Sequence, residues 1–200
     1  MIILGLTGSI GCGKSSLSNI FKDNNIDVID ADIVSRKIFE DSKLLSSVFE
    51  HFGENIKNED GSLNRKALGN IVFNDDNKLI ELNNLTHPRI KEKILEEIEN
   101  IKLHNKEVIV LDAPLLIEGG YLEIVDKLLV ITCNEDVQIS RIQKRDNCSK
   151  EEALRRISSQ ISQDEKIKYA DYVLDNSGDL NYLNEKAKEF LLYMKENWCG

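Results

Sequence analysis

Near its start the chain carries Gly8-Ser9-Ile10-Gly11-Cys12-Gly13-Lys14-Ser15, which fits the pattern G-x-x-x-x-G-K-[ST]. The octapeptide follows the short apolar run Ile2–Leu6 and leads into Ser15–Phe21, where apolar residues gather on one helical side. A strand, a glycine loop and a helix in this order are the setting of a nucleotide phosphate-binding loop. The sequence therefore predicts that this chain binds a nucleoside triphosphate.

Each part of this loop has an expected role. Glycine lets the backbone curl so that its N–H groups face the phosphates, and the helix N-terminus adds partial positive charge. Gly8, Gly11 and Gly13 are the glycines of the loop. Lys14 is expected to reach the β- and γ-phosphates, and the Ser15 hydroxyl is expected to ligate Mg²⁺.

Composition sets the class of protein. The chain has 200 residues, 41% hydrophobic and 30% charged, which suits one globular domain with a sizeable core. Its net charge of −9 argues against a nucleic-acid partner. No apolar stretch approaches the roughly 20 residues of a membrane span, and the N-terminus does not resemble a signal peptide. We expect a cytoplasmic monomer with no membrane association.

Positive charge is concentrated in one segment. Residues 141–168 hold eight lysines and arginines against five acidic residues. Two charged helices are expected across 136–168, hinged near residues 146–149, with Ser149 as N-cap of the second. Arg141 and Arg145 lie four apart on one helical face and suit phosphate oxygens, which predicts a lid. A solvated charged face is the alternative interpretation, and it stays open.

The remaining apolar runs predict an α/β fold. They are continuous rather than alternating, as in strands buried on both faces of a parallel sheet, and helical patterns separate them. The predicted fold is an open, doubly wound, five-stranded parallel sheet with a core of about 1–32, 106–135 and 169–200. After the first strand, the runs are Ile26–Ile29, Glu107–Leu111, Lys127–Thr132 and Tyr172–Leu174.

Residues 33–105 are too long for a simple crossover and predict a helical, substrate-binding insertion. The expected helices are 44–52, 65–73, 78–85 and 90–103. An insertion at this point would lie over the carboxyl ends of the strands, where ligands bind in open α/β sheets.

Three carboxylates follow predicted strands. Asp30 and Asp32 come directly after the second strand, where a carboxylate could accept a substrate proton, hold Mg²⁺ through water or cap the next helix. The residues alone leave these choices open. Asp112 closes the third strand and fits the second Mg²⁺-holding carboxylate of phosphate-loop enzymes, and a helix or turn cap is the alternative. A GTPase is disfavoured because the guanine-reading N-K-x-D motif is missing, and Asn105-Lys106-Glu107-Val108 comes nearest to it.

Several further motifs narrow the sequence to one family of phosphate-loop enzymes. Together with the glycine loop, they run in order through essentially the whole chain and resemble the dephospho-CoA kinase family. That resemblance implies a P-loop NTPase-type fold that transfers phosphate from ATP to the 3′-hydroxyl of dephospho-coenzyme A, with Mg²⁺. The motifs are Asp30-Ala31-Asp32, Arg65, His87-Pro88, Asp112–Glu118, Arg141-x-x-x-Arg145, Arg156-x-x-x-Gln160 and Ala170–Asn176.

The resemblance also assigns roles. It makes Asp32 the general base and gives catalytic roles to Lys14, Arg141 and Arg145. The implied ATP-binding residues are Gly8, Gly11, Cys12, Gly13, Lys14, Ser15, Ser16, Arg141 and Asn176. The implied acceptor-binding residues are Asp32, Arg65, His87, Pro114, Leu115 and Leu116. The implied metal-binding residues are Ser15 and Asp112, which would hold Mg²⁺ directly or through water.

Small departures and two alternatives accompany this interpretation. Ser9, Cys12 and Ile117 differ from the commonest residues of the family without removing a needed group. Another nucleoside monophosphate or small-molecule kinase is the closest alternative, and a nucleotide-switched binding protein is the alternative from another class.

The four cysteines have no metal-ligand spacing, so reduced thiols are expected. Cys12, near a helix N-terminus, is expected to be the reactive one.

Overall fold

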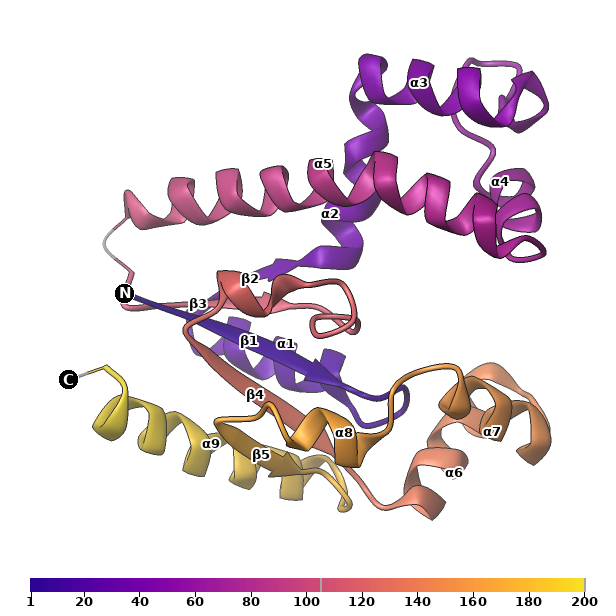
Figure 1. The fold of residues 1–200 in the computed structure, drawn as a ribbon. Helices are drawn as coiled ribbons and strands as arrows, with labels where there is room; N and C mark the ends of the chain where they lie inside the picture. The colour runs from indigo at the N-terminus through magenta and orange to yellow at the C-terminus, as the bar shows by residue number, and fades with distance from the viewer. Residues whose placement is uncertain (105, 200) are drawn as a thin grey trace. The chain divides into compact units, whose positions relative to one another are not determined.

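The computed structural model describes residues 1–104 and 106–199, which form two compact units. The sheet unit comprises Met1–Asp30 and Ile98–Gly200, and the helical unit comprises Ala31–Glu97. Figure 1 shows the elements of both. The predicted end of the insertion at Asn105 and the last predicted core residue, Gly200, lie outside the described residues.

The sheet has five parallel strands in the order β2-β3-β1-β4-β5. This arrangement confirms the predicted fold class. The strands are β1 (Ile2–Gly8), β2 (Asp27–Asp30), β3 (Val108–Asp112), β4 (Lys127–Thr132) and β5 (Tyr172–Asp175). Every residue of β3 is buried, as expected for a strand covered on both faces.

Polar residues meet at the carboxyl edge of this sheet. Asp30 and Asp112 are register partners where β2 and β3 end, and Thr132 is the partner of Asp175 where β4 and β5 end. The phosphate-binding loop leaves β1 at the same edge, because all five strands are parallel. The topology therefore gathers the chemistry-bearing residues of the sheet unit at one edge.

One face of the sheet packs against α1 (Lys14–Asp23) and α9 (Leu180–Asn197), which Figure 1 shows beside the strands. Phe21 of α1 and Phe190 of α9 are fully buried, with ring centroids 6.0 Å apart. Burying aromatic side chains between a sheet and its helices is a major source of stability. This packing fixes the start of α1, and with it the end of the phosphate-binding loop.

The turn after β3 packs closely on β1. A Cβ at Gly5 would lie only 2.8 Å from Leu116 Cδ1, so glycine allows this close approach. Leu116 is fully buried, while its neighbour Leu115 is 51% exposed. The turn then leads to the short helix η3 (Tyr121–Ile124).

Three helices cover the predicted lid, where two were expected. They are α6 (Glu135–Asp146), α7 (Lys150–Ser158) and α8 (Gln163–Ile167). Asn147 ends α6 in the left-handed conformation with φ 49°, and Ser149 opens α7 with a capping box to Glu152. The prediction missed α8 because five residues carry too little periodicity to reveal a helix.

The helical unit contains α2 (Ala31–Lys37), η1 (Ile38–Glu40), α3 (Ser42–Phe52), η2 (Glu54–Ile56), α4 (Arg65–Val72) and most of α5 (Asp76–Lys102). Its core joins apolar side chains of α3 and α4, among them Val48, Phe52 and Leu68. Within the described part of the chain, no helix is both long enough and apolar enough to cross a membrane.

One prediction for this unit is wrong. Two helices were expected over 78–85 and 90–103, but α5 is a single helix that continues through Pro88. Proline removes one backbone donor, which leaves the carbonyl of Asn84 without its usual partner in the helix. Asn84 is exposed, so water can bond that carbonyl, and apolar residues on both sides favour an uninterrupted helix.

Candidate active site

The phosphate-binding loop joins β1 to α1 and depends on two glycines with positive φ. Gly11 has φ 82° and Gly13 has φ 93°, a region that strongly favours glycine. A Cβ at Gly13 would lie 2.2 Å from Asn176 Nδ2, so a side chain there would also collide with its neighbour. The loop is further closed by the backbone bond from Cys12 N–H to the Ser9 carbonyl, at 3.1 Å.

Lys14 lies at the start of α1 and forms an ion pair with Asp112. The second carboxylate oxygen of Asp112 accepts a hydrogen bond from the Ser18 hydroxyl, one turn further along α1. Asp112 is only 3% exposed, so both of its oxygens are held in place by α1. The fold thereby brings two predicted site residues, Lys14 and Asp112, into direct contact.

The oxygen donors near this pair fit a magnesium ion. Ser15 is exposed in the first turn of α1, and Asp112 ends the neighbouring strand. Hydroxyl and carboxylate oxygens are hard ligands of the kind that Mg²⁺ prefers. Among the described residues, no cluster of three or more His, Cys, Asp or Glu side chains could hold a metal by itself. The donor set suits a cation bound by one or two side chains together with substrate phosphates and water.

A cavity of about 370 Å³ adjoins the loop, and its lining residues are Gly13, Ser16, Arg141, Asn176, Gly178, Asp179, Leu180 and Leu183. Arg141 donates to the carbonyls of Asn176 and Gly178, at 2.8 and 2.7 Å. Asn176 donates to the Cys12 carbonyl at 2.8 Å. Its Oδ1 is buried with no hydrogen-bond partner among the described residues. The cavity thus presents Arg141 and Asn176 directly beside the phosphate-binding loop.

Arg145 has different surroundings from Arg141. Its side chain is 58% exposed and pairs with Asp146 at 2.7 Å. Arg156 of α7 pairs with the same carboxylate. Hydrogen bonding to Arg145 is the main reason why the pKa of Asp146 lies below its usual range. The two arginines are therefore linked through Asp146 at the junction of α6 and α7.

The predicted acceptor-binding turn follows β3 in the sheet unit. The Pro114 carbonyl accepts a hydrogen bond from the Thr7 hydroxyl at 3.0 Å, which ties the turn to the end of β1. Gly119 N–H bonds the Leu115 carbonyl at 2.7 Å and closes the turn. The result is a fixed turn with an exposed leucine near the phosphate-binding loop.

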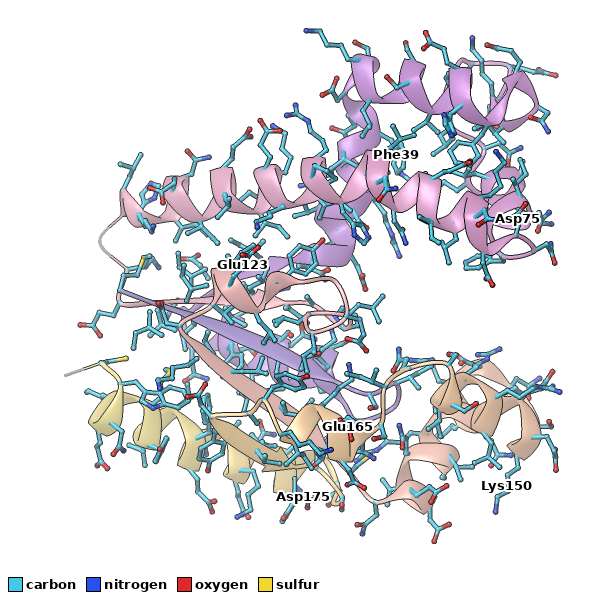
Figure 2. All side chains as sticks on the ribbon, in the orientation of Figure 1. Phe39, Asp75, Glu123, Lys150, Glu165 and Asp175 are labelled. Carbon is cyan, nitrogen blue, oxygen red and sulfur yellow. The ribbon has the colours of Figure 1, made fainter. Side chains whose placement is uncertain are left out.

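The other predicted acceptor residues belong to the helical unit. Asp32 is exposed in the first turn of α2, two residues after Asp30 ends β2. Arg65 donates to the Arg36 carbonyl at 2.7 Å and covers the ring of Phe39, which Figure 2 labels, at 5.1 Å. His87 is exposed on α5. The roles of these residues stay predictions.

The expectation of a reactive Cys12 thiol is wrong. Cys12 is fully buried, and its Sγ lies 3.4 Å from that of Cys133. The hydrogen bond with Cys133, together with burial, raises the pKa of the Cys12 thiol. The sequence places Cys12 near a helix N-terminus, but it could not show that the side chain points into the core.

Sequence analysis missed several polar contacts of the loop. Gln160 accepts a hydrogen bond from Ile10 N–H at 3.0 Å, and Gln138 donates to the Ile10 carbonyl at 2.7 Å. Lys166 of α8 is fully buried. Gln160 is part of the motif Arg156-x-x-x-Gln160, but the motif alone predicted no role for it. The spacing of three residues from Gln160 to Gln163 and on to Lys166 was a weak signal of a shared face.

Comparison with known sequences gives a consistent picture. The family model described as dephospho-CoA kinase matches residues 2–182. The chain is 40% identical over 195 residues to a dephospho-CoA kinase of Listeria monocytogenes, covering 97% of this chain and 98% of that protein. It is also 40% identical over 180 residues to one of Bacillus cereus, covering 90% of each.

Solved structures agree with the sequences. The dephospho-CoA kinase from Campylobacter jejuni is similar with a TM-score of 0.76 and 32% identity, covering 97% of both chains. Shikimate kinase from Acinetobacter baumannii has a TM-score of 0.56 at 12% identity, covering 100% of this chain and 96% of that one. At that identity the second likeness shows the fold alone.

Proposed function

The chain belongs to the dephospho-CoA kinase family, and on that premise we propose that it phosphorylates the 3′-hydroxyl of dephospho-coenzyme A with ATP. The products are coenzyme A and ADP, so the reaction is the final step of coenzyme A synthesis. The observation that carries the proposal is the phosphate-binding loop with Lys14 and Asp112 at the carboxyl edge of the sheet.

ATP occupies the loop and the adjoining cavity. The N–H groups of the loop and the start of α1 face the phosphates, and Lys14 neutralises charge on the β- and γ-phosphates. The cavity beside Gly13 takes the adenosine, where Arg141 stacks or pairs and Asn176 lines the wall. The position of this cavity directly beside the phosphate-binding loop supports the assignment.

The acceptor is activated by Asp32, which takes the proton of the 3′-hydroxyl as the γ-phosphoryl group transfers in line. Arg65, His87 and the turn Pro114–Leu116 bind the rest of dephospho-coenzyme A. Arg141 and Arg145, within the lid of residues 136–168, offset developing charge and exclude water. The family resemblance and the positive charge of the segment support these roles.

Ser15 and Asp112 hold Mg²⁺, the carboxylate through water. The bound ion would neutralise phosphate charge in the transition state. The oxygen chemistry of the two side chains supports the assignment. A chelator should therefore abolish activity, and added Mg²⁺ should restore it.

We propose a cytoplasmic monomer without a nucleic-acid partner. The net charge of −9 supports the last of these points, because nucleic-acid binders usually carry a basic surface. Light scattering during gel filtration tests the oligomeric state. A mass of two chains would contradict this part of the proposal.

An acceptor panel tests the activity itself. ADP release from Mg·ATP is followed with dephospho-coenzyme A, with adenosine, with AMP and with no acceptor. Release that depends on dephospho-coenzyme A supports the proposal. Preference for AMP or adenosine would favour another small-molecule kinase, and equal slow release without any acceptor would favour a nucleotide-switched binding protein.

A further inference from the structure

A fully buried lysine lies outside the residues assigned above. Lys166 is 0% exposed on the short helix α8, next to Glu165, which Figure 2 labels. Its ammonium group lies 2.9 and 3.2 Å from the two carboxylate oxygens of Glu118 and 3.1 Å from the Pro114 carbonyl. A buried charge is costly unless it is paired, and here three acceptors are available for the three N–H donors.

These contacts converge on the turn after β3. The Pro114 carbonyl accepts from both Lys166 and the Thr7 hydroxyl, at 3.1 and 3.0 Å. Glu118, at the other end of the same turn, is held by the same ammonium group. Lys166 therefore fixes both ends of the segment that presents Leu115 to solvent.

The chain leading into Lys166 also contacts the phosphate-binding loop. Gln160 accepts from Ile10 N–H at 3.0 Å. Gln163 accepts from Cys133 N–H at 2.9 Å and donates to the Cys133 carbonyl at 3.0 Å, directly after β4. Residues 160–166 thus join three places at the carboxyl edge of the sheet: the loop after β1, the end of β4 and the turn after β3.

We propose that Lys166 is a positioning residue that sets the turn Pro114–Leu116 relative to the phosphate-binding loop. Lys166 touches neither substrate and acts through the Pro114 carbonyl and Glu118. This inference rests on the proposed function, in which that turn binds dephospho-coenzyme A. A purely structural role, in which the ion pair only stabilises the fold, is the rival explanation.

Lys166→Met tests the inference, because methionine keeps an apolar stem and removes the ammonium group. The KM for dephospho-coenzyme A should rise by about tenfold or more, as expected when hydrogen bonds to a charged group are lost. The KM for ATP should change by less than about twofold, because Gln160 and Gln163 keep their contacts. Lys168→Met is the matched control, since Lys168, the C-cap of α8, is exposed and forms its ion pair with Glu165 of that helix.

Gln160→Ala provides the opposite perturbation in the same segment. It removes the acceptor of Ile10 N–H in the phosphate-binding loop. The KM for ATP should rise, while the KM for dephospho-coenzyme A should stay within about twofold of that of the unmodified chain. A crossed pattern of this kind does not follow from a general loss of stability.

The double variant Lys166→Met with Glu118→Leu separates positioning from stability. Replacing both members of a buried ion pair with apolar residues is often neutral for stability, whereas removing one member is not. The melting temperature should therefore recover, while the KM for dephospho-coenzyme A should stay raised, because the Pro114 carbonyl still lacks the ammonium donor. If Lys166→Met does not fold, the double variant carries the test.

Two results overturn the positioning role while the proposed function stands. One is an unchanged KM for dephospho-coenzyme A in folded Lys166→Met, and the other is joint recovery of melting temperature and KM in the double variant. An unmodified chain that transfers no phosphate to dephospho-coenzyme A contradicts the proposed function, and the positioning role falls with it. The unmodified chain, measured in the same assay, distinguishes these cases.

Discussion

Among single side chains, Lys14 has the strongest electrostatic role in the proposed mechanism. Lys14→Ala removes the positive charge that faces the β- and γ-phosphates, so turnover should fall by about 10²-fold or more. Steady-state ADP release measures the loss, and circular dichroism checks that the variant is folded. Lys22→Ala, on an exposed position of the same helix, should keep full activity. More than about a tenth of the original turnover in Lys14→Ala would reject the loop as the phosphate-binding site.

The two carboxylates after β2 can be distinguished by amide substitution. Asp32→Asn keeps the shape of the side chain but cannot take a proton, so turnover should fall by roughly 10²- to 10⁴-fold. ATP binding, measured by calorimetry, should change far less. Asp30→Asn is the matched comparison, because Asp30 ends the strand two residues earlier. Loss of turnover in Asp30→Asn alone would make Asp30 the base.

Burial reverses the sequence-based expectation for the cysteines. Cys12 and Cys133 are buried together, and the pKa of the Cys12 thiol is raised, so at neutral pH it holds its proton. Cys148 is only partly buried. A maleimide should label Cys148 well before Cys12, as peptide mapping over time would show. First labelling at Cys12 would contradict the buried position of its side chain.

Single residues also show what sequence can and cannot reveal. Lys14, Ser15 and Asp112 could be predicted because a fixed motif and the end of an apolar strand place them. The contact between Lys166 and Pro114 joins residues 52 positions apart, and no local pattern encodes such a pair. An isolated lysine is usually exposed, so its burial is visible only once the fold is known.

At the scale of elements, α6, α7 and α8 form the segment proposed as a lid. If it closes over bound substrates, limited proteolysis within 136–168 should be suppressed when ATP and dephospho-coenzyme A are both present. Arg141→Ala should slow turnover, since this arginine holds the carbonyls of Asn176 and Gly178 beside the nucleotide cavity. Unchanged cleavage with both substrates at saturation would make the segment a fixed, solvated face.

The boundaries of helices and strands were predicted accurately only where the hydrophobic pattern of the segment is strong. Buried strands such as β4 were predicted residue for residue, because a continuous apolar run is bounded by polar residues. The helix α5 was divided wrongly at Pro88, since tertiary context outweighed the local proline signal. The five-residue α8 begins at an N-cap, Ser162, whose hydroxyl accepts from Glu165 N–H, and this S-x-x-E pattern was a signal that the prediction did not use. The burial of Lys166 in the same helix has no comparable signal in the sequence.

For the whole molecule, sequence order was sufficient to predict the class of sheet. Five apolar runs separated by helices allow few topologies, because crossover connections between parallel strands are almost always right-handed. The division into a sheet unit and a helical unit follows from the long segment between β2 and β3. Measurements with dephospho-coenzyme A are needed to test which side chains of the helical unit bind the acceptor.

The most direct measurement identifies where the new phosphate is attached. The chain is incubated with Mg·ATP and dephospho-coenzyme A, and the product is analysed by mass spectrometry and phosphorus NMR. The account predicts one added phosphate, as a monoester on the ribose 3′-oxygen, with one ADP formed for each product molecule. A phosphate on another oxygen, or ADP formed without a phosphorylated product, would contradict the account.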